Sequence, residues 1–112
     1  MSPDLLPIEP LSQVVFVHSY LQLVFQDSCF SIYNSCSLSF RGTSFHFGVP
    51  GFADTLVGFI GQPLTNVSAI GEDSISLIFA NSAVLSVARE GVGPEAWQFN
   101  SLNGPIVVEQ NA

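Results

Sequence analysis

The chain contains two copies of one sequence pattern. Residues 10–14, Pro-Leu-Ser-Gln-Val, return as Pro-Leu-Thr-Asn-Val at 63–67, and residues 21–29 return in similar form at 75–83. Two copies are too few for a solenoid, which needs three or more repeats to bury its faces. The repeat therefore predicts two similar units that pack around one common core.

Each copy has the pattern of antiparallel strands. Apolar and polar residues alternate in both runs, which is typical of a strand with one buried face. The side chains predicted to face the core are Leu21, Leu23, Phe25, Ile75, Leu77 and Phe79. Each run ends at a turn dipeptide, is followed by a second alternating run, and is preceded by a strand that begins at Val14 or Val67. Each unit is thus predicted to be a three-stranded meander.

Further apolar segments follow each meander, at 38–40 and 45–47 in the first half and at 97–99 and 106–108 in the second. Nine or ten short strands with polar turns and no helical period are typical of an all-β protein. We predict an antiparallel sandwich or a partly open barrel, built from two similar meanders of three to five strands with pseudo-twofold symmetry.

Residues 1–112 are predicted to form a single domain, since this length is close to the commonest domain size. The internal repeat covers roughly 10–47 and 63–108. The linker between them, 48–62, is rich in glycine and contains Asp54, which we predict to be the N-cap of a single helical turn.

Charge restricts the class of partner. Nine acidic residues face two arginines and no lysine, so the net charge is -7. Such a charge repels nucleic acid and anionic membranes and attracts a basic protein. The beginning of the chain lacks the pattern of a secretory signal, and no stretch has the roughly 20 apolar residues of a membrane helix. We therefore expect a cytoplasmic protein that binds neither nucleic acid nor membrane.

The apolar content is high for a small domain. Apolar residues make up 47% of the chain and charged residues 10%, against the roughly 25% charged that soluble domains usually have. Val24 and Ile78, at matched places in the repeat, point away from the predicted core face. Either the linker or a neighbouring strand covers them, or they form a self-interface in a homodimer.

No motif assigns a reaction. The serines lack a nucleophile elbow, and His18 and His46 lack the spacing of metal ligands. Cys29 and Cys36 have neither zinc nor redox spacing and are predicted to be free thiols. We predict no catalytic residue, no cofactor and no metal. Enzymatic activity stays open only through His46, if the fold places it beside an acid in a deep pocket.

The second half, from Leu56 to Phe99, resembles a loose class of small bacterial all-β proteins of unknown function, some of them immunity-like proteins encoded beside toxins. The segments that carry the resemblance are Gly61-Gln62-Pro63-Leu64, Leu77-Ile78-Phe79-Ala80-Asn81-Ser82, Leu85-Ser86-Val87 and Gly93-Pro94-Glu95-Ala96-Trp97. Those proteins usually have Asp-Gly or Asn-Gly at the hairpin. Ser28 and Ser82 replace that glycine here, so we expect a turn other than type I′. The resemblance implies a fold and no activity.

Two functions follow as hypotheses. The first is a small acidic binding protein, most concretely an immunity-type inhibitor of a basic protein partner such as a toxin, because acids speed the capture of a cationic surface. The acids predicted to contact that partner are Glu72, Asp73, Glu90 and Glu95. The alternative is a self-associating structural or small-ligand-binding β-module with no catalytic activity.

Overall fold

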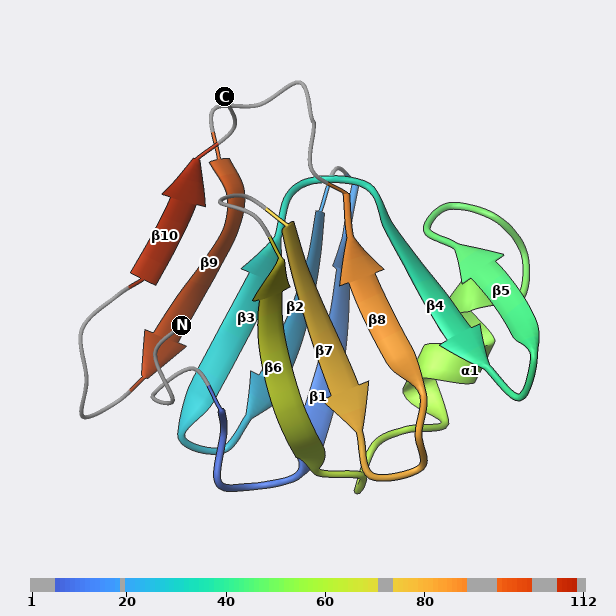
Figure 1. Ribbon diagram of the computed structural model, residues 1–112, viewed down its shortest axis with the longest axis horizontal. Helices are drawn as coiled ribbons and strands as arrows, with labels where there is room; N and C mark the ends of the chain where they lie inside the picture. The colour runs from blue at the N-terminus through green and yellow to red at the C-terminus, as the bar shows by residue number, and fades with distance from the viewer. Residues whose placement is uncertain (1–5, 19, 71–73, 89–94, 102–106, 111–112) are drawn as a thin grey trace.

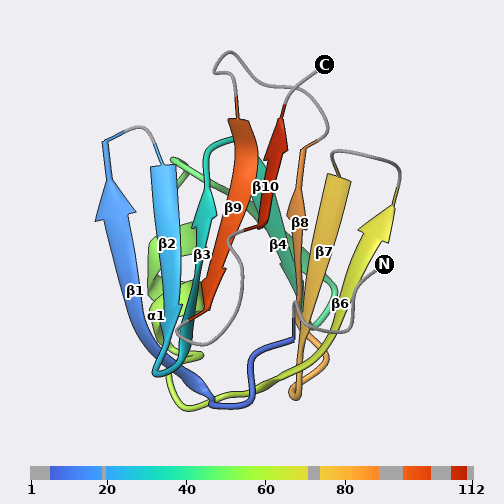
Figure 2. The ribbon, with the colours of Figure 1, turned by 90° about the vertical axis from the view of Figure 1, so that its left-hand side faces the viewer.

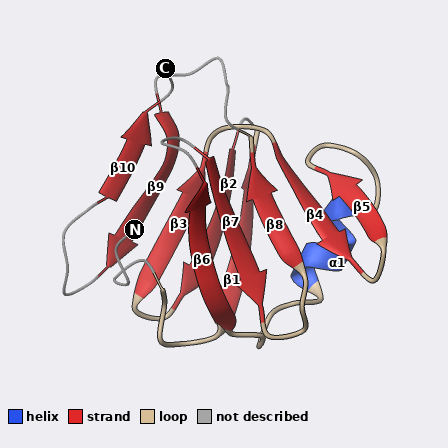
Figure 3. Cartoon of the chain, viewed as in Figure 1, coloured by secondary structure: helices blue, strands red, loops and turns tan. Residues whose placement is uncertain are grey.

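The computed structural model describes residues 6–18, 20–70, 74–88, 95–101 and 107–110. For residues 69–70, 74, 95, 101 and 107–110 it describes the backbone only. The described residues form ten strands and one short helix (Figures 1 and 3). None of them forms a helix long and apolar enough to cross a membrane.

The strands form two antiparallel sheets of five. The first sheet has the order β1 (Leu11–Val17), β2 (Tyr20–Phe25), β3 (Ser28–Ile32), β9 (Glu95–Ser101) and β10 (Val107–Gln110). The second has the order β5 (Thr43–His46), β4 (Cys36–Phe40), β8 (Val84–Val87), β7 (Ser74–Phe79) and β6 (Leu64–Ile70). All described pairs are antiparallel, so the predicted all-β antiparallel class is confirmed.

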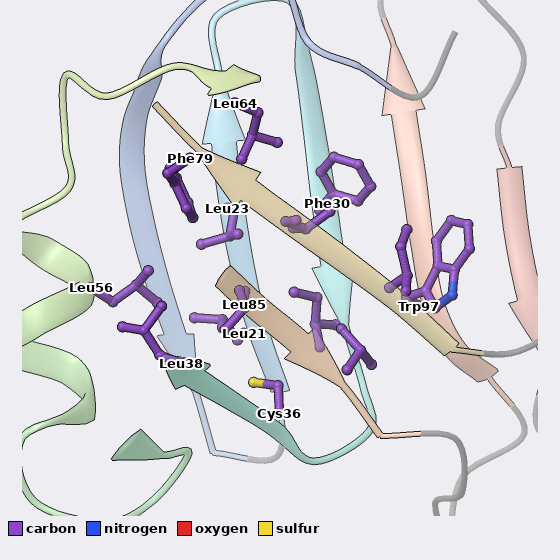
Figure 4. Close-up of a cluster of buried hydrophobic side chains, with 14 of the residues drawn as sticks. Leu21, Leu23, Phe30, Cys36, Leu38, Leu56, Leu64, Phe79, Leu85 and Trp97 are labelled. Atoms are coloured by element: carbon purple, nitrogen blue, oxygen red, sulfur yellow. The ribbon is translucent and has the colours of Figure 1, made fainter. Parts of the chain in front are cut away.

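The two sheets face each other, as Figure 2 shows. The outer strands of each sheet have one strand neighbour within the described residues, so these strands do not close into a barrel. One hydrophobic cluster fills the space between the sheets (Figure 4). The side chains predicted to face the core all lie in this cluster and are at most 1% exposed: Leu21, Leu23, Phe25, Ile75, Leu77 and Phe79. Alternation therefore predicted the buried face of both meanders correctly.

The sheets do not coincide with the two halves of the sequence. β1, β2 and β3 form the meander of the first half, but β4 pairs with β8 of the second half and carries β5 on its other side. In the same way β9 leaves the second half and pairs with β3, and it carries β10 on its other side. Each sheet is thus a meander from one half and a hairpin from the other. The last two strands occupy matching places even though their sequences diverge.

The two meanders also match in detail. β1 and β2 shift register between Leu11 and Gln13, and β6 and β7 shift register at the corresponding place, between Leu64 and Asn66. The residue inside each shift donates a hydroxyl hydrogen bond across the pair. Ser12 Oγ donates to the carbonyl oxygen of Val24 at 2.9 Å, and Thr65 Oγ1 donates to that of Ile78 at 3.2 Å.

The hairpin turns of the meanders differ by one residue. Phe25 pairs directly with Ser28, whereas Phe79 donates its N–H to the carbonyl oxygen of Ala83 around a turn in which Ser82 has a left-handed φ of 72°. The extra residue therefore lies in the turn. The sequence repeat aligns Cys29 with Ala83, but in the strands the position of Cys29 is matched by Val84.

Neither of these turns is type I′, as expected, because that turn needs positive φ at both central residues. The β4–β5 hairpin meets that requirement, since Arg41 and Gly42 have φ of 51° and 79°. Arg41 lies over the ring of Phe40, with 4.9 Å between the guanidinium carbon and the ring centroid.

The single described helix, α1 (Phe52–Val57), packs against β1 and β4 at one side of the two sheets (Figure 1). Phe52 and Leu56 are four residues apart, share one helix face and are buried. The prediction for Asp54 is wrong. Gly51 is the N-cap, with φ of 98° and no side-chain bond, and Asp54 lies in the first turn. Glycine is favoured there because L side chains rarely adopt this positive φ, and a Cβ would also lie 3.0 Å from the ring of Phe45.

Candidate functional site

The charged residues are concentrated outside the first eight strands. β1 to β8 contain no aspartate, glutamate, lysine or arginine, so these eight strands present no acidic, lysine or arginine side chain on the outer faces of the two sheets. The acids occur in the connections, in the segments outside the sheets and in the last two strands. Any electrostatic attraction of a partner must therefore act mainly through the ends of the two sheets.

The four acids predicted to bind a partner fall largely outside the described residues. Glu72 and Asp73 belong to the connection between β6 and β7, and Glu90 belongs to the connection between β8 and β9. The structure describes neither connection at these positions. Glu95 is the first residue of β9, and its backbone pairs with Gln110, but its side chain is outside the description.

The strand ends that flank these acids lie together. Ile75, at the beginning of β7, pairs with Val87, the last residue of β8. Ile70 pairs with Ser74 at the end of the β6–β7 ladder. The chain thus leaves β6 and β8 at the same end of the second sheet. The segments that contain Glu72, Asp73 and Glu90 begin there.

Asn34 holds both ends of the segment that contains Glu90. Its backbone N–H donates to the carbonyl oxygen of Ala96 at 3.1 Å, and its Nδ2 donates to the carbonyl oxygen of Ala88 at 2.9 Å. The N–H of Tyr33 also donates to Ala96, and the N–H of Ala88 donates to the carbonyl oxygen of Ser35 at 2.7 Å. Asn34 is only 3% exposed. The crossing from β3 to β4 therefore fixes where the chain leaves β8 and where it enters β9.

His46 lies in a shallow recess on the outer face of the second sheet. The recess has a volume of about 190 Å³ and is lined by Ser35, Cys36, Ser37, His46, Ser86, Val87 and Ala88. His46 is exposed and pairs in register with Ser37, which pairs in turn with Ser86. No carboxylate is among the described residues that line the recess. The other histidine, His18, is exposed in the turn between β1 and β2.

Val24 and Ile78 both lie half-buried on outer faces, but on opposite sides of the molecule. Each belongs to the central part of a different sheet and alternates with core residues. The structure therefore does not bring them into one surface, and a single twofold interface between two copies would use one of them. Neither α1 nor the linker covers them as a pair, since α1 packs against β1 and β4.

Val24 lines a second recess. This recess has a volume of about 260 Å³, lies beside the β2–β3 turn, and is lined by Val24, Phe25, Gln26, Asp27, Ser28, Cys29 and Asn100. Asp27 Oδ1 is buried, and it has no hydrogen-bond partner among the described residues. From the sequence, Asp27 was interpreted only as part of a turn dipeptide, so the recess was not predicted. The one signal in the sequence was an aspartate that has neither of the two arginines near it along the chain.

Both cysteines are free thiols, as predicted. Burial raises the pKa of Cys29, while a hydrogen bond with Ser31 acts in the opposite direction. Burial alone raises the pKa of Cys36 from 9.0 to about 12. Both thiols are therefore protonated at neutral pH and are poor nucleophiles. Within the described part of the chain, no group of three or more histidine, cysteine or acidic side chains could hold a metal ion.

No protein-family model, curated protein or solved structure matches this chain.

Proposed function

We propose that this protein is a non-catalytic binding protein that captures a basic protein through the acids at one end of its two sheets. The observation that supports this proposal is that the chain leaves β6 and β8 at the same end of the second sheet. The hydrogen bonds of Asn34 to Ala88 and Ala96 also hold the chain in place there. The acids assigned to contact the partner are Glu72, Asp73, Glu90 and Glu95.

The distribution of charge supports this mode of binding. A net charge of -7 with no charged residue in β1 to β8 directs attraction to the connections and to the acids of β9 and β10, and away from the other strands. Acids grouped at one end accelerate encounter with a cationic surface and orient it before contact. A tightly held point of exit from β8, such as the one that Asn34 provides, reduces the ordering cost of binding.

The partner most consistent with this chemistry is a basic toxin, such as a nuclease, whose active surface the protein would cover as an immunity-type inhibitor. The bacterial resemblance of residues 56–99 supports this more specific form. The scaffold would be an antiparallel sandwich whose two meanders are related by pseudo-twofold symmetry. The matched register shifts and the matched hydroxyl bonds of Ser12 and Thr65 support that symmetry.

The proposal is tested by tagged capture of the protein from the organism that encodes it, at low and at high salt, with mass spectrometry of what is recovered. We expect a stoichiometric basic protein that is lost at high salt, because exposed charge pairs are screened. Recovery of this protein without a basic partner at either salt concentration contradicts the proposal.

Two charge variants locate the contact. Glu72→Gln with Asp73→Asn, and Glu9→Gln with Asp54→Asn, each reduce the net charge from -7 to -5, because each removes two acids. The first pair should slow association with the recovered partner and flatten its salt dependence, whereas the second should change association little. Equal effects of the two pairs would show that only the total charge matters and would remove Glu72 and Asp73 from the contact.

A second candidate is the self-associating or small-ligand-binding β-module. The recess beside Val24 favours its ligand-binding form, because Val24 and Asp27 line one concave surface. The self-associating form would place Val24 or Ile78 in a twofold interface. Light scattering at micromolar concentration distinguishes the two forms, since a monomeric mass would exclude the self-associating form.

A further inference from the structure

The outer face of the first sheet has a row of polar, uncharged side chains at its centre. Gln22 of β2 pairs with Ser31 of β3, and Ser31 pairs with Gln98 of β9. Each of the three lies between core residues along its strand, so its side chain is on the outer face. In Figure 2, no other described element lies over this face. Ser31 is buried and the two glutamines are half-buried, so the glutamines are the groups of this row that a ligand reaches.

Hydrogen bonds hold the amides of this face in position. Gln22 Nε2 donates to Ser31 Oγ at 3.3 Å. Gln98 Nε2 donates at 3.1 Å to the Oδ1 of Asn100, the next outward residue of β9. No described residue bonds to the Oε1 of either glutamine or to the Nδ2 of Asn100. The face thus offers two oxygen acceptors and one amide donor group, and their fixed positions reduce the ordering cost of binding.

Apolar surface flanks these amides at both ends. Tyr20 and Tyr33 lie at one end, where their ring centroids are 5.3 Å apart and the rings are tilted by 46°. At the other end is the recess of about 260 Å³, whose lining includes Val24, Cys29 and Asn100. Tyr20 and Val24 are both on β2, and the four steps between them span about 14 Å of strand. The face is therefore long enough for a short chain of linked rings.

The charges of the chain select a neutral ligand for this face. β1, β2 and β3 contain no acidic, lysine or arginine residue, and the net charge of -7 repels an anion. Asp27, in the turn after β2, also lines the recess, and it has no role in this site. Side-chain amides form no ion pair, but they both donate to and accept from hydroxyl groups. A neutral ligand with many hydroxyl groups therefore fits the face better than an ion does.

We propose that the outer face of the first sheet binds a neutral oligosaccharide in an extended conformation, which lies along β2 and β3 from the recess to the tyrosine pair. Sugar hydroxyls both donate and accept, which matches the acceptors of Gln22 and Gln98 and the donors of Asn100. The C–H faces of the sugar rings are apolar, and they pack on the tyrosine rings and on Val24. An extended chain is favoured because it follows the direction of the strands.

This site gives a ligand class to the small-ligand-binding form of the second candidate function, and it rests on that form. It is independent of the proposed capture of a basic protein, because it uses none of the four acids assigned to that contact. Salt distinguishes the two activities. Salt screens interactions between exposed charges, so the affinity for a neutral sugar should be the same at low and high salt, whereas the basic partner should be lost at high salt.

Nuclear magnetic resonance titration with cellotetraose, a neutral and extended glucose oligomer, tests the proposal. A few hydrogen bonds and ring contacts on an open face correspond to a Kd on the order of 1 mM. The side-chain amide signals of Gln22, Gln98 and Asn100 should shift with one common Kd. The signal of Asn66, which is on the second sheet, should not shift. Maltotetraose has the same sugar units in a bent chain, and it should bind at least about tenfold more weakly.

Gln98→Ala should raise the Kd for cellotetraose by about tenfold, because it removes one acceptor and the hydrogen bond that positions Asn100. Asn66→Ala removes an amide from the other sheet and should leave the Kd unchanged. The backbone amide spectrum verifies that each variant is folded. If Gln98→Ala does not fold, the comparison of cellotetraose with maltotetraose in the natural sequence decides alone.

Three results would overturn the proposal. They are the absence of any shift with cellotetraose, a shift of Asn66 as large as those of the three amides on the first sheet, and equal affinity for the two oligosaccharides. A loss of cellotetraose binding at high salt would also contradict it, because the site has no charge pair to screen. Failure of the basic-protein capture experiment leaves this titration unchanged, since the two tests use different residues and different readouts.

Discussion

Asn34 and Ala88 are 54 residues apart in the chain, and the Nδ2 of Asn34 donates a 2.9 Å hydrogen bond to the carbonyl oxygen of Ala88. The same asparagine donates its backbone N–H to Ala96. One buried residue in the crossing between the sheets thus positions both ends of the segment in which Glu90 lies, through its side chain at Ala88 and through its backbone at Ala96. The first prediction concerns this contact.

Asn34→Ala should lower the free energy of unfolding by about 1–3 kcal/mol, because it leaves the half-buried Ala88 carbonyl without its side-chain donor. Urea unfolding measures the change as a lower midpoint with an unchanged slope. Asn66→Ala is the matched control, since Asn66 is an exposed amide on β6. Similar losses in both variants would show that the contact of Asn34 has no special weight.

Ser12→Ala and Thr65→Val should each reduce stability by about 0.5–1.5 kcal/mol, since each removes one hydroxyl hydrogen bond at a register shift. The two sites lie on different sheets, so the double variant should lose the sum within about 0.5 kcal/mol. Thr65→Ser keeps the hydroxyl and should keep most of the stability. If the loss in the double variant differed strongly from the sum of the two single losses in chemical denaturation, the two sites would be energetically coupled through the core, and the prediction would be wrong.

Leu56→Ala should destabilise the protein by about 2–5 kcal/mol, because it leaves a cavity in the core where α1 packs. Val57→Ala changes the adjacent residue, which is 45% exposed, and should change stability by less than about 0.5 kcal/mol. Thermal unfolding followed through Trp97 compares the two. Equal effects of the two substitutions would mean that Leu56 of α1 is not packed in the core in solution.

Cys36→Ala should reduce the pH dependence of stability in alkaline solution. Burial raises the pKa of Cys36 from 9.0 to about 12, so the folded state holds the thiol proton more tightly than the unfolded state. The contribution is fully present below pH 9 and is lost as the pH rises from 9 toward 12, because the unfolded thiol ionises first.

Urea unfolding at pH 8 and pH 10 measures this difference. The natural sequence should lose more stability between these two values than Cys36→Ala does, even though the substitution itself costs some stability at both through the loss of packing. An identical pH dependence in the two proteins would contradict the assignment of the buried thiol.

Much of the fold was predictable from local pattern. The alternation of Leu21, Leu23 and Phe25 and of Ile75, Leu77 and Phe79 identified the buried faces, because the period of two in a strand is a local property of the backbone. The repeat also predicted the matching meanders. The length of the β7–β8 turn could not be predicted from the sequence, because the one extra residue between Phe79 and Ala83 can be aligned with the first half at more than one place.

The sequence by itself thus determined the all-β class and the inward faces of β2 and β7, whereas β1 and β6 begin at Leu11 and Leu64, three residues before the predicted starts at Val14 and Val67. Only the tertiary structure decided that β4 and β5 cross to the sheet of the other half, that Asn34 bridges Ala88 and Ala96, and that Asp27 lies beside Val24 and Asn100 in a recess. The physical reason is range. Side-chain alternation is set within a few residues, whereas the pairing of distant strands depends on how the whole core fills, which no local pattern encodes.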